Sequence, residues 1–572
     1  MLFFAQPDAT APTLLDLLDA RLHAEPDAAC VVMRHRDGER TISTRQFVTR
    51  ANAYAGALHS AGIRRGDLVA LILTHGEDVL FAFWGALLLG AVPSIFPFLT
   101  EKLDRESYFD SARRLIEAEA VRVVITYDAL ESELRARLHG VPTLRAILNR
   151  DALQPAPAAD LPAPNINADD TAFLQHSSGS TGLQKGVMLS HRAVLNQISA
   201  YSDAIRLKRE DVIASWLPLY HDMGLIAAFI LPIVQGIKLV LMSPFHWVRD
   251  PKILLYAITD HRATLCWLPN FAYNFMASRI RPADLHRVDL SSVRALINCS
   301  EPVYDESHRA FTARFSPHGF NPRALATCYA MAENTFAVTQ GGIDVPLTVD
   351  HVRRSTLINQ RIAHPADPAG DDVQAFVCNG RPIRNCDVQI VGEDGTTAQA
   401  ERRVGEIRVR SDCLMTGYYA RPDLSAEVLR DGWYMTGDMG YLADGQLYIT
   451  GRKKDLIIVG GKNIYPQDIE YLLNEIDGLH AGRVTAFGVM NAELGTEDIA
   501  IVAEVRDGID AGDGKQTTPI IRAIRGRIAA HTDVTARYVH LVGAKWLIKT
   551  SSGKIARAAN RDKFRRDVLG DK

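Results

Sequence analysis

The sequence lacks the features that mark secreted, zinc-binding or nucleic-acid-binding proteins. Its seven cysteines are odd in number, widely spaced and free of any Cys-x-x-Cys pair, which argues against a disulfide scaffold or a structural zinc site. The charges nearly balance, with 64 Lys and Arg against 67 Asp and Glu, so no nucleic-acid partner is expected. No basic residue precedes the apolar patch at the N-terminus. We therefore expect no secretory signal and predict a cytoplasmic protein.

Long apolar runs are also scarce. The longest uncharged run, Val79–Phe98, matches a membrane span in length. Gly85, Gly90, Pro93 and Pro97 interrupt it, and we expect them to divide it into a helix, a tight turn and a short apolar strand. The sequence therefore favours an α/β core, and we predict no integral membrane association.

What the chain does have is length and apolar content. Its 572 residues are too many for one hydrophobic core and correspond to about three or four core-sized units. Of these residues, 47% are apolar and 23% are charged. Up to about residue 150, helix-period stretches such as 45–62 alternate with apolar strands such as 68–73 and 122–126. This pattern predicts a doubly wound layer on a parallel sheet. The proline-rich residues 151–164 predict a linker or a surface strap.

The second half of the chain changes character twice. After the linker, a second alternating block carries strand-like runs, and from about residue 388 short β-segments separated by Gly turns take over. From about residue 454, helices such as 466–476 mix with strands such as 499–505, which indicates a smaller α+β domain. The strand-like runs of the second block are 172–174, 212–217, 238–241, 264–268 and 295–298.

The strongest local signal is residues 175–186, QHSSGSTGLQKG. Its glycines let the backbone turn N–H groups inward, its hydroxyls add donors and Lys185 adds a positive charge, a combination that suits a polyphosphate. No G-x-x-x-x-G-K-[ST] occurs, so a P-loop NTPase is disfavoured. Taken alone, the stretch fits a flexible surface loop equally well. The predicted phosphate-binding residues are Ser177, Ser178, Gly179, Ser180, Thr181, Gly182 and Lys185.

SSGSTGLQKG resembles the phosphate-binding motif of the adenylate-forming enzymes, which include acyl-CoA synthetases, peptide-synthetase adenylation domains and luciferases. Five further elements follow in that family's order, and six ordered motifs are far more specific than any one. These five are WLPLYHDMGL at 216–225, YAMAENT at 329–335, YMTGD at 434–438, GRKKDLIIVGGKNIYP at 451–466 and SSGK at 551–554.

The resemblance implies the fold and the domain boundaries. We expect an α/β multidomain protein whose large N-terminal domain, residues 1–452, holds two doubly wound α/β subdomains and a small β-barrel-like subdomain. A small, mobile α+β domain, residues 453–572, follows as a lid. Lys454 falls at the family's hinge position, where the dihedral angles of one residue swing the small domain.

The resemblance also implies ATP and Mg²⁺ as cofactors and assigns the site. Lys554 would bridge the substrate carboxylate and the α-phosphate, and Glu333 would hold Mg²⁺ against the phosphates. Asp438 and Arg452 would contact the ribose and Tyr329 would cover the adenine. The full adenine and ribose set is Ser300, Glu301, Pro302, Tyr329, Ala330, Met331, Asp438 and Arg452.

Each of these residues also has a plainer interpretation when it is taken alone. Glu333 would be a solvated helix start and Asp438 a turn residue that caps its own backbone. Residues 452–455 would be a solvated charge run, and Lys554 an exposed lysine. Only the ordered set of motifs favours the functional interpretation.

Within the family, several phrases resemble the fatty acyl-AMP ligases, the branch that delivers acyl groups to carrier proteins. They include LPLYHDMGLI, SEPV, YAMAENTF and NIYPQDIE. The stretch at about 347–375 resembles the insertion that marks this branch and hinders its use of coenzyme A, although a long structureless loop is the alternative. The acyl pocket would involve His221, Met223 and Phe271; His221 could instead be structural, bonded to Asp222 or to the backbone.

The predicted reaction is therefore ATP-dependent activation of a fatty or related carboxylic acid. The acyl group would pass in trans to the phosphopantetheine thiol of a holo acyl carrier protein through a transient contact, in lipid or polyketide biosynthesis. Three alternatives stay open at this point. They are an acyl-CoA synthetase, a nucleotide-binding regulator without turnover and, remotely, a membrane transporter.

Overall fold

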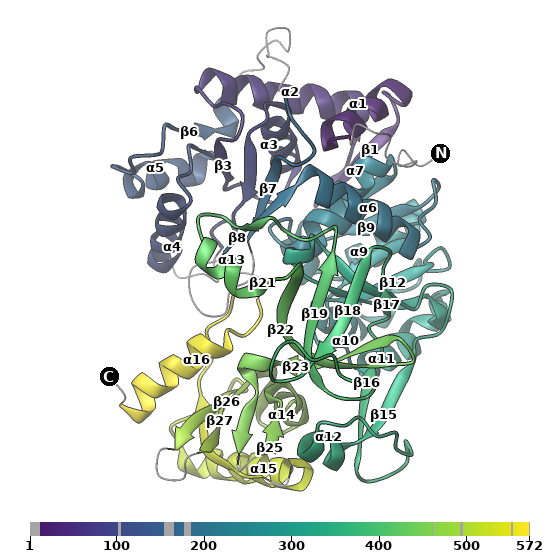
Figure 1. Cartoon of the computed structure of the whole chain (residues 1–572), viewed down its shortest axis with the longest axis vertical. Helices are drawn as coiled ribbons and strands as arrows, with labels where there is room; N and C mark the ends of the chain where they lie inside the picture. Colours follow the sequence, from purple (N-terminus) through teal and green to yellow (C-terminus); the bar gives the residue numbers. More distant parts are fainter. Residues whose placement is uncertain are drawn as a thin grey trace.

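The computed structural model describes residues 12–100, 105–153, 165–176, 185–459, 462–491, 496–532, 534–550 and 553–570. Over these ranges the chain forms two large sheets, a curled sheet and a small C-terminal α+β unit (Figure 1). Ser177, Ser178, Gly179, Ser180, Thr181 and Gly182, all predicted phosphate ligands, lie outside the described residues.

The first large sheet has the strand order β20-β8-β7-β4-β3-β5-β6. Its central strands are parallel and fully buried because helices cover them, as the apolar sequence of each strand requires. The strands are β3 (Leu68–Leu71), β4 (Val92–Ile95), β5 (Val123–Thr126), β6 (Ala146–Asn149), β7 (Thr171–His176), β8 (Gly186–Ser190) and β20 (Gly417–Tyr418). The helices that follow β3, β4 and β5 are α3 (Glu77–Leu88), α4 (Arg105–Ala118) and α5 (Asp128–Arg137).

The long uncharged run 79–98 forms part of this layer. It makes up most of α3, a turn at Gly90, whose φ is 74°, and β4. The predicted division into helix, turn and strand is confirmed. Among the described residues, no helix combines the length and the hydropathy that a membrane crossing needs.

The second large sheet has the strand order β17-β14-β13-β12-β11-β9-β10-β1-β2. Its strands are β1 (Ala29–His35), β2 (Gly38–Ser43), β9 (Val212–Ser215), β10 (Lys238–Met242), β11 (Leu265–Leu268), β12 (Ala295–Cys299), β13 (Leu325–Ala330), β14 (Ala337–Gly341) and β17 (Arg381–Pro382). Its helices include α1 (Leu14–Ala24), α2 (Thr44–Ser60), α6 (His191–Ala204), α8 (Pro244–Arg249), α9 (Lys252–His261), α10 (Asn270–Arg279) and α11 (Asp305–Phe315).

The expected division of these two layers at the proline-rich linker was wrong in one respect. β1 and β2 precede the linker but belong to the second sheet, where β1 pairs with β10. β7 and β8 follow the linker but belong to the first sheet. Alternating hydrophobicity gives the order of strands along the chain and not their partners, so the exchange has no local signal.

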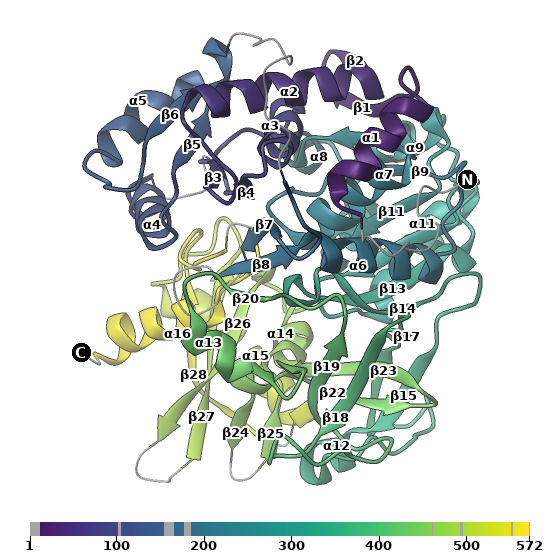
Figure 2. The same ribbon diagram turned by 45° about the horizontal axis from the view of Figure 1, so that its top comes forward.

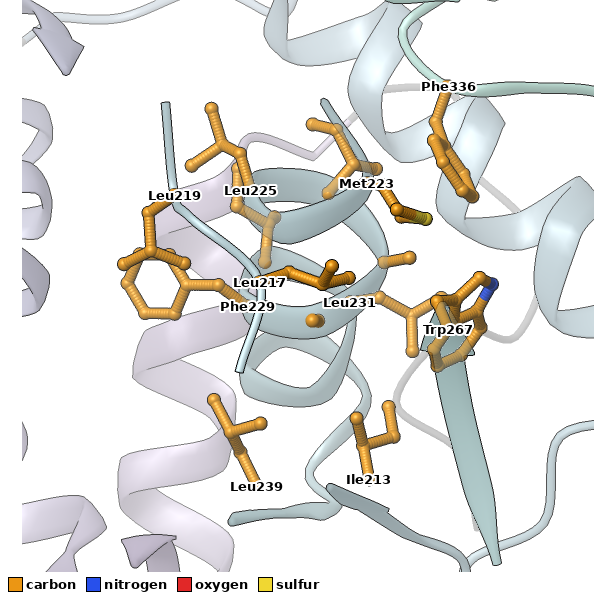
Figure 3. Packing of buried hydrophobic residues seen from close by; sticks show 14 of the residues in the cluster. Ile213, Leu217, Leu219, Met223, Leu225, Phe229, Leu231, Leu239, Trp267 and Phe336 are labelled. Atoms are coloured by element: carbon orange, nitrogen blue, oxygen red, sulfur yellow. The ribbon is translucent and has the colours of Figure 1, made fainter. Parts of the chain in front are cut away.

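A wholly buried helix links the second sheet to the site. The π-helical turn Met223–Ile230 continues into α7 (Leu231–Gln235). Gly224 is required at its start, because a Cβ there would lie 2.2 Å from the carbonyl oxygen of Pro218. Figure 3 shows this helix packed among buried side chains, which include Ile213, Leu217, Leu219, Leu239, Trp267 and Phe336.

The curled sheet lies near the centre of Figure 1, and the predicted insertion, with α12 (Arg354–Gln360) and β15 (Val349–Arg353), lies at its lower right. The curled sheet is built from β18 (Cys386–Val391), β19 (Gly405–Ser411), β21 (Leu429–Arg430), β22 (Trp433–Ala443) and β23 (Gln446–Arg452), with α13 (Pro422–Val428) before β21. Residues 347–375 are not a structureless loop. They contain β15 and α12, and β15 pairs with β16 (Val373–Val377).

The C-terminal unit has its own apolar core, which includes Ile457, Ile469 and Ile524. Figure 2 shows it beside the curled sheet. It contains a three-stranded sheet in the order β26-β27-β28, flanked by helices. Its elements are β24 (Ile457–Val459), β25 (Lys462–Ile464), α14 (Pro466–Leu473), β26 (Leu479–Asn491), β27 (Thr496–Val505), α15 (Gly514–Thr532), β28 (Ala536–Val542) and α16 (Arg557–Phe564).

The insertion contacts this C-terminal unit directly. Gln374 Nε2 donates to Asp468 Oδ2 at 2.9 Å, and Arg354 donates to the carbonyl oxygen of His531 at 3.2 Å. Outside the insertion, the rings of Tyr304 and Tyr471 stack with their centroids 4.3 Å apart. These contacts hold the C-terminal unit in one orientation against the rest of the chain.

Asp468→Asn is expected to raise the free energy of unfolding above pH 7 by about 1 to 2 kcal/mol. Burial raises the pKa of Asp468 from 3.8 to about 7. Between about pH 4 and 7, Asp468 is ionised in the unfolded chain but still protonated in the folded protein. The free energy of unfolding of the parent therefore falls as the pH rises through this range and stays lower above pH 7. Asparagine has no such proton, and its oxygen can still accept the bond from Gln374. The melting temperatures of the parent and Asp468→Asn at pH 4 and pH 8 check this. An equal increase in melting temperature at both pH values would contradict the expectation.

Candidate active site

Three predicted nucleotide contacts meet where β13 faces the end of the curled sheet. The hydroxyl of Tyr329 donates to Asp438 Oδ2 at 2.7 Å. Arg452 Nε lies 3.1 Å from Asp438 Oδ1, because Asp438 and Arg452 are paired across β22 and β23. Thr436 Oγ1 accepts the Asp438 N–H at 3.0 Å. A fixed carboxylate between a phenol and a guanidinium is suited to accept hydrogen bonds from a diol.

Glu333 lies in a short helical turn directly after β13. Its Oε1 accepts the hydroxyl of Tyr418 at 2.9 Å, and its backbone carbonyl accepts the Met415 N–H at 2.8 Å. Two residues later, Thr335 has a φ of 61°, a left-handed conformation that is unusual for a β-branched residue. Strain of this kind clusters at functional sites, where the surrounding structure enforces it.

The surroundings of Glu333 fit a magnesium ion shared with phosphates. The described chain gives its Oε2 no hydrogen bond, which leaves one carboxylate oxygen for a cation. Mg²⁺ is commonly held by one or two carboxylates together with substrate phosphates and water. Among the described residues, no group of three or more His, Cys, Asp or Glu could enclose a metal ion, so Glu333 would hold the ion only with the help of a bound polyphosphate.

Lys554 reaches this region from the C-terminal unit. Its Nζ donates to the carbonyl oxygen of Ser300 at 2.5 Å, although the two residues are 254 positions apart. Ser300 follows β12 and has a φ of 70°. The lysine also acts electrostatically on both His221 and Asp222. The contact brings a cation from one lobe to the polar edge of the other.

The segment after β9 adds an uncharged imidazole and a buried carboxyl group. Burial and the nearby charge of Lys554 lower the pKa of His221 to about 3, so the ring is neutral at physiological pH. Its Nε2 is buried without a hydrogen-bond partner in the described chain, so this nitrogen bonds neither Asp222 nor the backbone. Burial raises the pKa of Asp222 to about 6, and Glu333 adds to that shift.

The predicted acyl-pocket residues differ in burial. Met223 is buried, and its Sδ lies 3.9 Å from the Ser300 hydroxyl. Phe271 on α10 is 42% exposed, and its ring contacts Trp216 and Trp247, which stack on each other with centroids 3.7 Å apart. These three rings form an aromatic wall at the start of α10 that opens partly to solvent.

The remaining predicted residues surround this centre. Lys185 Nζ lies 4.7 Å from the centre of the Tyr418 ring, and Tyr418 is the residue that bonds Glu333. Glu301 Oε2 accepts the Phe271 N–H at 3.1 Å, which occupies its carboxylate at the start of α10, and Pro302 beside it is exposed. The predicted adenine residues Ala330 and Met331 are both partly exposed; Ala330 ends β13 and Met331 precedes the turn that carries Glu333.

Lys454 directly follows the Arg452–Lys453 pair, at the start of the C-terminal unit. Burial, together with the charge of Arg452, lowers its pKa from the ordinary value. The structure therefore places this cation beside the Asp438–Arg452 pair, at the point where the chain leaves the curled sheet.

Comparison with known proteins identifies the family. A profile described as AMP-binding enzyme matches residues 18–419. The chain belongs to the AMP-binding enzymes. The resemblance inferred from six motifs is thus confirmed, and so is the assignment as an ATP-dependent acid ligase.

Relatives of this AMP-binding enzyme align over nearly the whole chain. A putative acyl-CoA synthetase of Caulobacter vibrioides is 31% identical, and the alignment covers 98% of this chain and 97% of the relative. A medium-chain-fatty-acid–[acyl-carrier-protein] ligase of Moorena producens is also 31% identical, with 97% and 96% covered. A solved structure from a study of the fatty acyl-adenylate ligases of E. coli and L. pneumophila is 31% identical, has a TM-score of 0.88 and is covered to 98% in both chains. The predicted fold class is confirmed.

Some residues of this AMP-binding enzyme's site gave no signal in the sequence. Tyr418 lies outside the six motifs yet links Glu333 and Lys185. At the base of the β7–β8 hairpin, the ring nitrogens of His176 lie 3.1 Å from Ser94 Oγ and 2.8 Å from Glu119 Oε1. All three side chains are buried, and they hold one end of the stretch predicted to bind phosphates. His176 belongs to the first motif, but Tyr418, Ser94 and Glu119 lie outside all six motifs, and only three-dimensional proximity reveals them.

Proposed function

We propose that this enzyme is a fatty acyl-AMP ligase. It would activate a fatty or related carboxylic acid with ATP and pass the acyl group in trans to the phosphopantetheine thiol of an acyl carrier protein. One observation carries the proposal: Lys554 Nζ lies 2.5 Å from the Ser300 carbonyl oxygen, on the same polar edge as His221 and Asp222, whose pKa values its charge lowers. A cation at that point is suited to stabilise the transfer of charge between a carboxylate and a phosphate.

The adenylation step joins two anions, so the protein's main task is to align them and neutralise charge. A carboxylate oxygen of the acid attacks the α-phosphorus of ATP, the bond to the bridging oxygen of the β-phosphate breaks, and pyrophosphate leaves. Asp438 and Arg452 would hold the ribose and Tyr329 the adenine. Lys185, with the hydroxyls and glycines of 177–182, would hold the outgoing phosphates.

Lys554 would bridge the attacking carboxylate and the α-phosphate, where its charge offsets the charge that both reactants bring together. Glu333 would hold Mg²⁺, which supplies additional positive charge to the phosphates. The neutral His221, with its unpartnered Nε2, would offer a hydrogen bond near the carboxyl end of the acid. Met223 and the aromatic rings around Phe271 would border the acyl chain.

The two lobes would act as separate domains, residues 1–452 and 453–572, with Lys454 as the hinge. In the present arrangement Lys554 lies against Ser300, which would correspond to the adenylation step. A rotation about Lys454 would then withdraw Lys554 and open the site for the acceptor. The pKa of Lys454 is lowered mainly by burial, so a rotation that exposes this side chain to solvent would favour its charged form.

Two observations support a carrier protein as the acceptor. A relative aligned over 97% of this chain is named as a ligase that acts on an acyl carrier protein. The insertion at 347–375 is folded and bonded to the C-terminal unit through Gln374 and Arg354, which fits a branch-specific insertion better than a structureless loop. A relative named as a putative acyl-CoA synthetase keeps coenzyme A as the competing acceptor.

An acceptor assay tests the proposal. The enzyme is incubated with ATP, Mg²⁺ and a medium- or long-chain fatty acid, together with either a holo acyl carrier protein or coenzyme A. We expect acyl-adenylate in both reactions and a thioester on the carrier protein only. Mass spectrometry detects both products. The apo carrier protein, which lacks the thiol, is the matched control. Efficient acyl-CoA formation with no acyl carrier protein product would contradict the proposed acceptor.

A further inference from the structure

The turn that carries Lys554 is held closed by its own backbone. Thr550 N–H donates to the Lys554 carbonyl oxygen at 2.7 Å, and Gly553 N–H donates to the Thr550 carbonyl oxygen at 2.8 Å. Lys549 and Ile555 form an antiparallel bridge across its base. We call Lys549, Thr550 and residues 553–555 the Lys554 turn. Such a closed turn moves as a unit, so its anchor on the C-terminal unit decides where the amine lies.

Arg557 provides that anchor on the first turn of α16, three residues after Lys554. Its guanidinium forms a bidentate pair with Glu470, with Nε lying 3.1 Å from Oε1 and Nη2 lying 2.8 Å from Oε2. Its other terminal nitrogen, Nη1, lies 2.5 Å from Asp455 Oδ2. All three side chains are about four-fifths buried, so solvent screens these ion pairs much less than surface pairs.

The two carboxylates connect Arg557 to different parts of the C-terminal unit. Asp455 directly follows Lys454, where the chain enters that unit. Glu470 belongs to α14, and its Oε1 also accepts the Ala486 N–H of β26 at 2.9 Å. Arg557 therefore ties the Lys554 turn to the first residues after the hinge and to the domain's central sheet at once.

A second side chain of α16 fixes the other side of the turn. Asn560 is fully buried. Its Oδ1 accepts the Ile548 N–H at 2.8 Å, and its Nδ2 donates to the Ile548 carbonyl oxygen at 2.8 Å. Asn560 thus pairs with the backbone before the turn as a neighbouring strand would. With this side fixed, the ion pairs of Arg557 determine the orientation of the turn relative to the hinge.

We infer that Arg557 is a positioning residue for Lys554, acting through Asp455 and Glu470 and never touching the reactants. The inference rests on the proposed function, because it requires that Lys554 act in adenylation. All three partners belong to residues 453–572, so the ion pairs persist when that unit rotates. They would allow the hinge to deliver Lys554 to the same point on every turnover.

A double-mutant cycle tests the inference. Acyl-adenylate formation is measured in single turnover, with enzyme in excess, for the parent, Arg557→Ala, Lys554→Ala and the double variant. In the parent background, Arg557→Ala is expected to slow the step about 10- to 100-fold, because a small displacement of a catalytic group has an effect of that size. In the Lys554→Ala background it should cause little further loss, since residues that act through one another are not additive.

Two variants keep the test decisive if Arg557→Ala folds poorly. Arg557→Lys retains one charge but loses the two-pronged geometry, so we expect a smaller loss with the same dependence on Lys554. Arg537→Ala removes an ion pair with Asp498 at 2.9 Å on β28, away from the Lys554 turn, and should leave the rate unchanged in both backgrounds. Melting temperatures verify that each variant is folded.

The outcomes separate this inference from the proposed function. Equal losses from Arg557→Ala with and without Lys554 would overturn the positioning role and leave adenylation intact. A parent that forms no acyl-adenylate, or a Lys554→Ala variant as fast as the parent, would overturn both. A loss confined to enzymes that retain Lys554 would support the inference.

Discussion

Lys554→Ala is expected to slow acyl-adenylate formation by about a hundred- to a thousandfold, equivalent to about 3 to 4 kcal/mol of transition-state stabilisation. The physical reason is that a carboxylate and a triphosphate repel each other, and Lys554 brings a cation to Ser300 where they would meet. Alanine removes that cation without disturbing the Asp438–Arg452 pair. Release of pyrophosphate, followed in a stopped-flow assay, measures the effect.

The same variant should transfer an acyl group from supplied acyl-adenylate at a rate much closer to that of the parent, because this second step no longer joins two anions. Lys563→Ala is a suitable control. Lys563 lies on α16, after the turn that carries Lys554, and its amine donates to the Trp546 carbonyl oxygen at 2.8 Å, away from Ser300, so adenylation should be unaffected. Unchanged pyrophosphate release in Lys554→Ala would show that the assigned role is wrong.

Glu333→Gln should reduce the rate about a hundredfold at low magnesium concentration and raise the Mg²⁺ concentration needed for half-maximal activity. An amide oxygen is a weaker ligand for a hard cation than a carboxylate oxygen. Glutamine can still accept the Tyr418 hydroxyl, so the local structure should persist. Titrating adenylation with Mg²⁺ at fixed ATP checks the expectation.

Tyr418→Phe provides the matched control for Glu333. It removes the 2.9 Å hydrogen bond to Oε1 but retains the carboxylate and the ring under Lys185. Its magnesium requirement should therefore stay near that of the parent, whereas that of Glu333→Gln should rise. If both variants showed the same magnesium dependence as the parent, Glu333 would not be the metal ligand.

Many residues of the candidate site could be predicted because they lie within short sequence motifs. The structure brings Tyr329, Asp438 and Arg452 into one hydrogen-bonded group and places Lys554 on Ser300. The adenylate-forming fold and the helix, turn and strand of 79–98 were also predictable. The roles of the residues in the site remain predictions.

What the sequence did not reveal depends on contacts between distant segments. Glu119 directly follows α4, where nothing in the sequence indicates that it faces His176, 57 positions later. In the sequence, Arg557 is one of several basic residues in a helix. Only the structure shows that Glu470 and Asp455 bind it. Asp222 resembles an ordinary helix cap in the sequence, and its burial, with a further effect of Glu333, raises its pKa to about 6. The pairing of β1 with β10 has the same origin, since strand partners are set by packing of the whole chain.

The most direct test of this account is the detection of the adenylate itself. The enzyme is mixed with ATP, Mg²⁺ and a panel of fatty and other carboxylic acids, without any acceptor, and the products are analysed by mass spectrometry while pyrophosphate is quantified. We predict that a fatty acyl-AMP and an equal amount of pyrophosphate appear with the parent and are nearly absent with Lys554→Ala. Formation of no acyl-AMP from any acid, or the same amount with both proteins, would contradict the claim that the two lobes form one adenylating site.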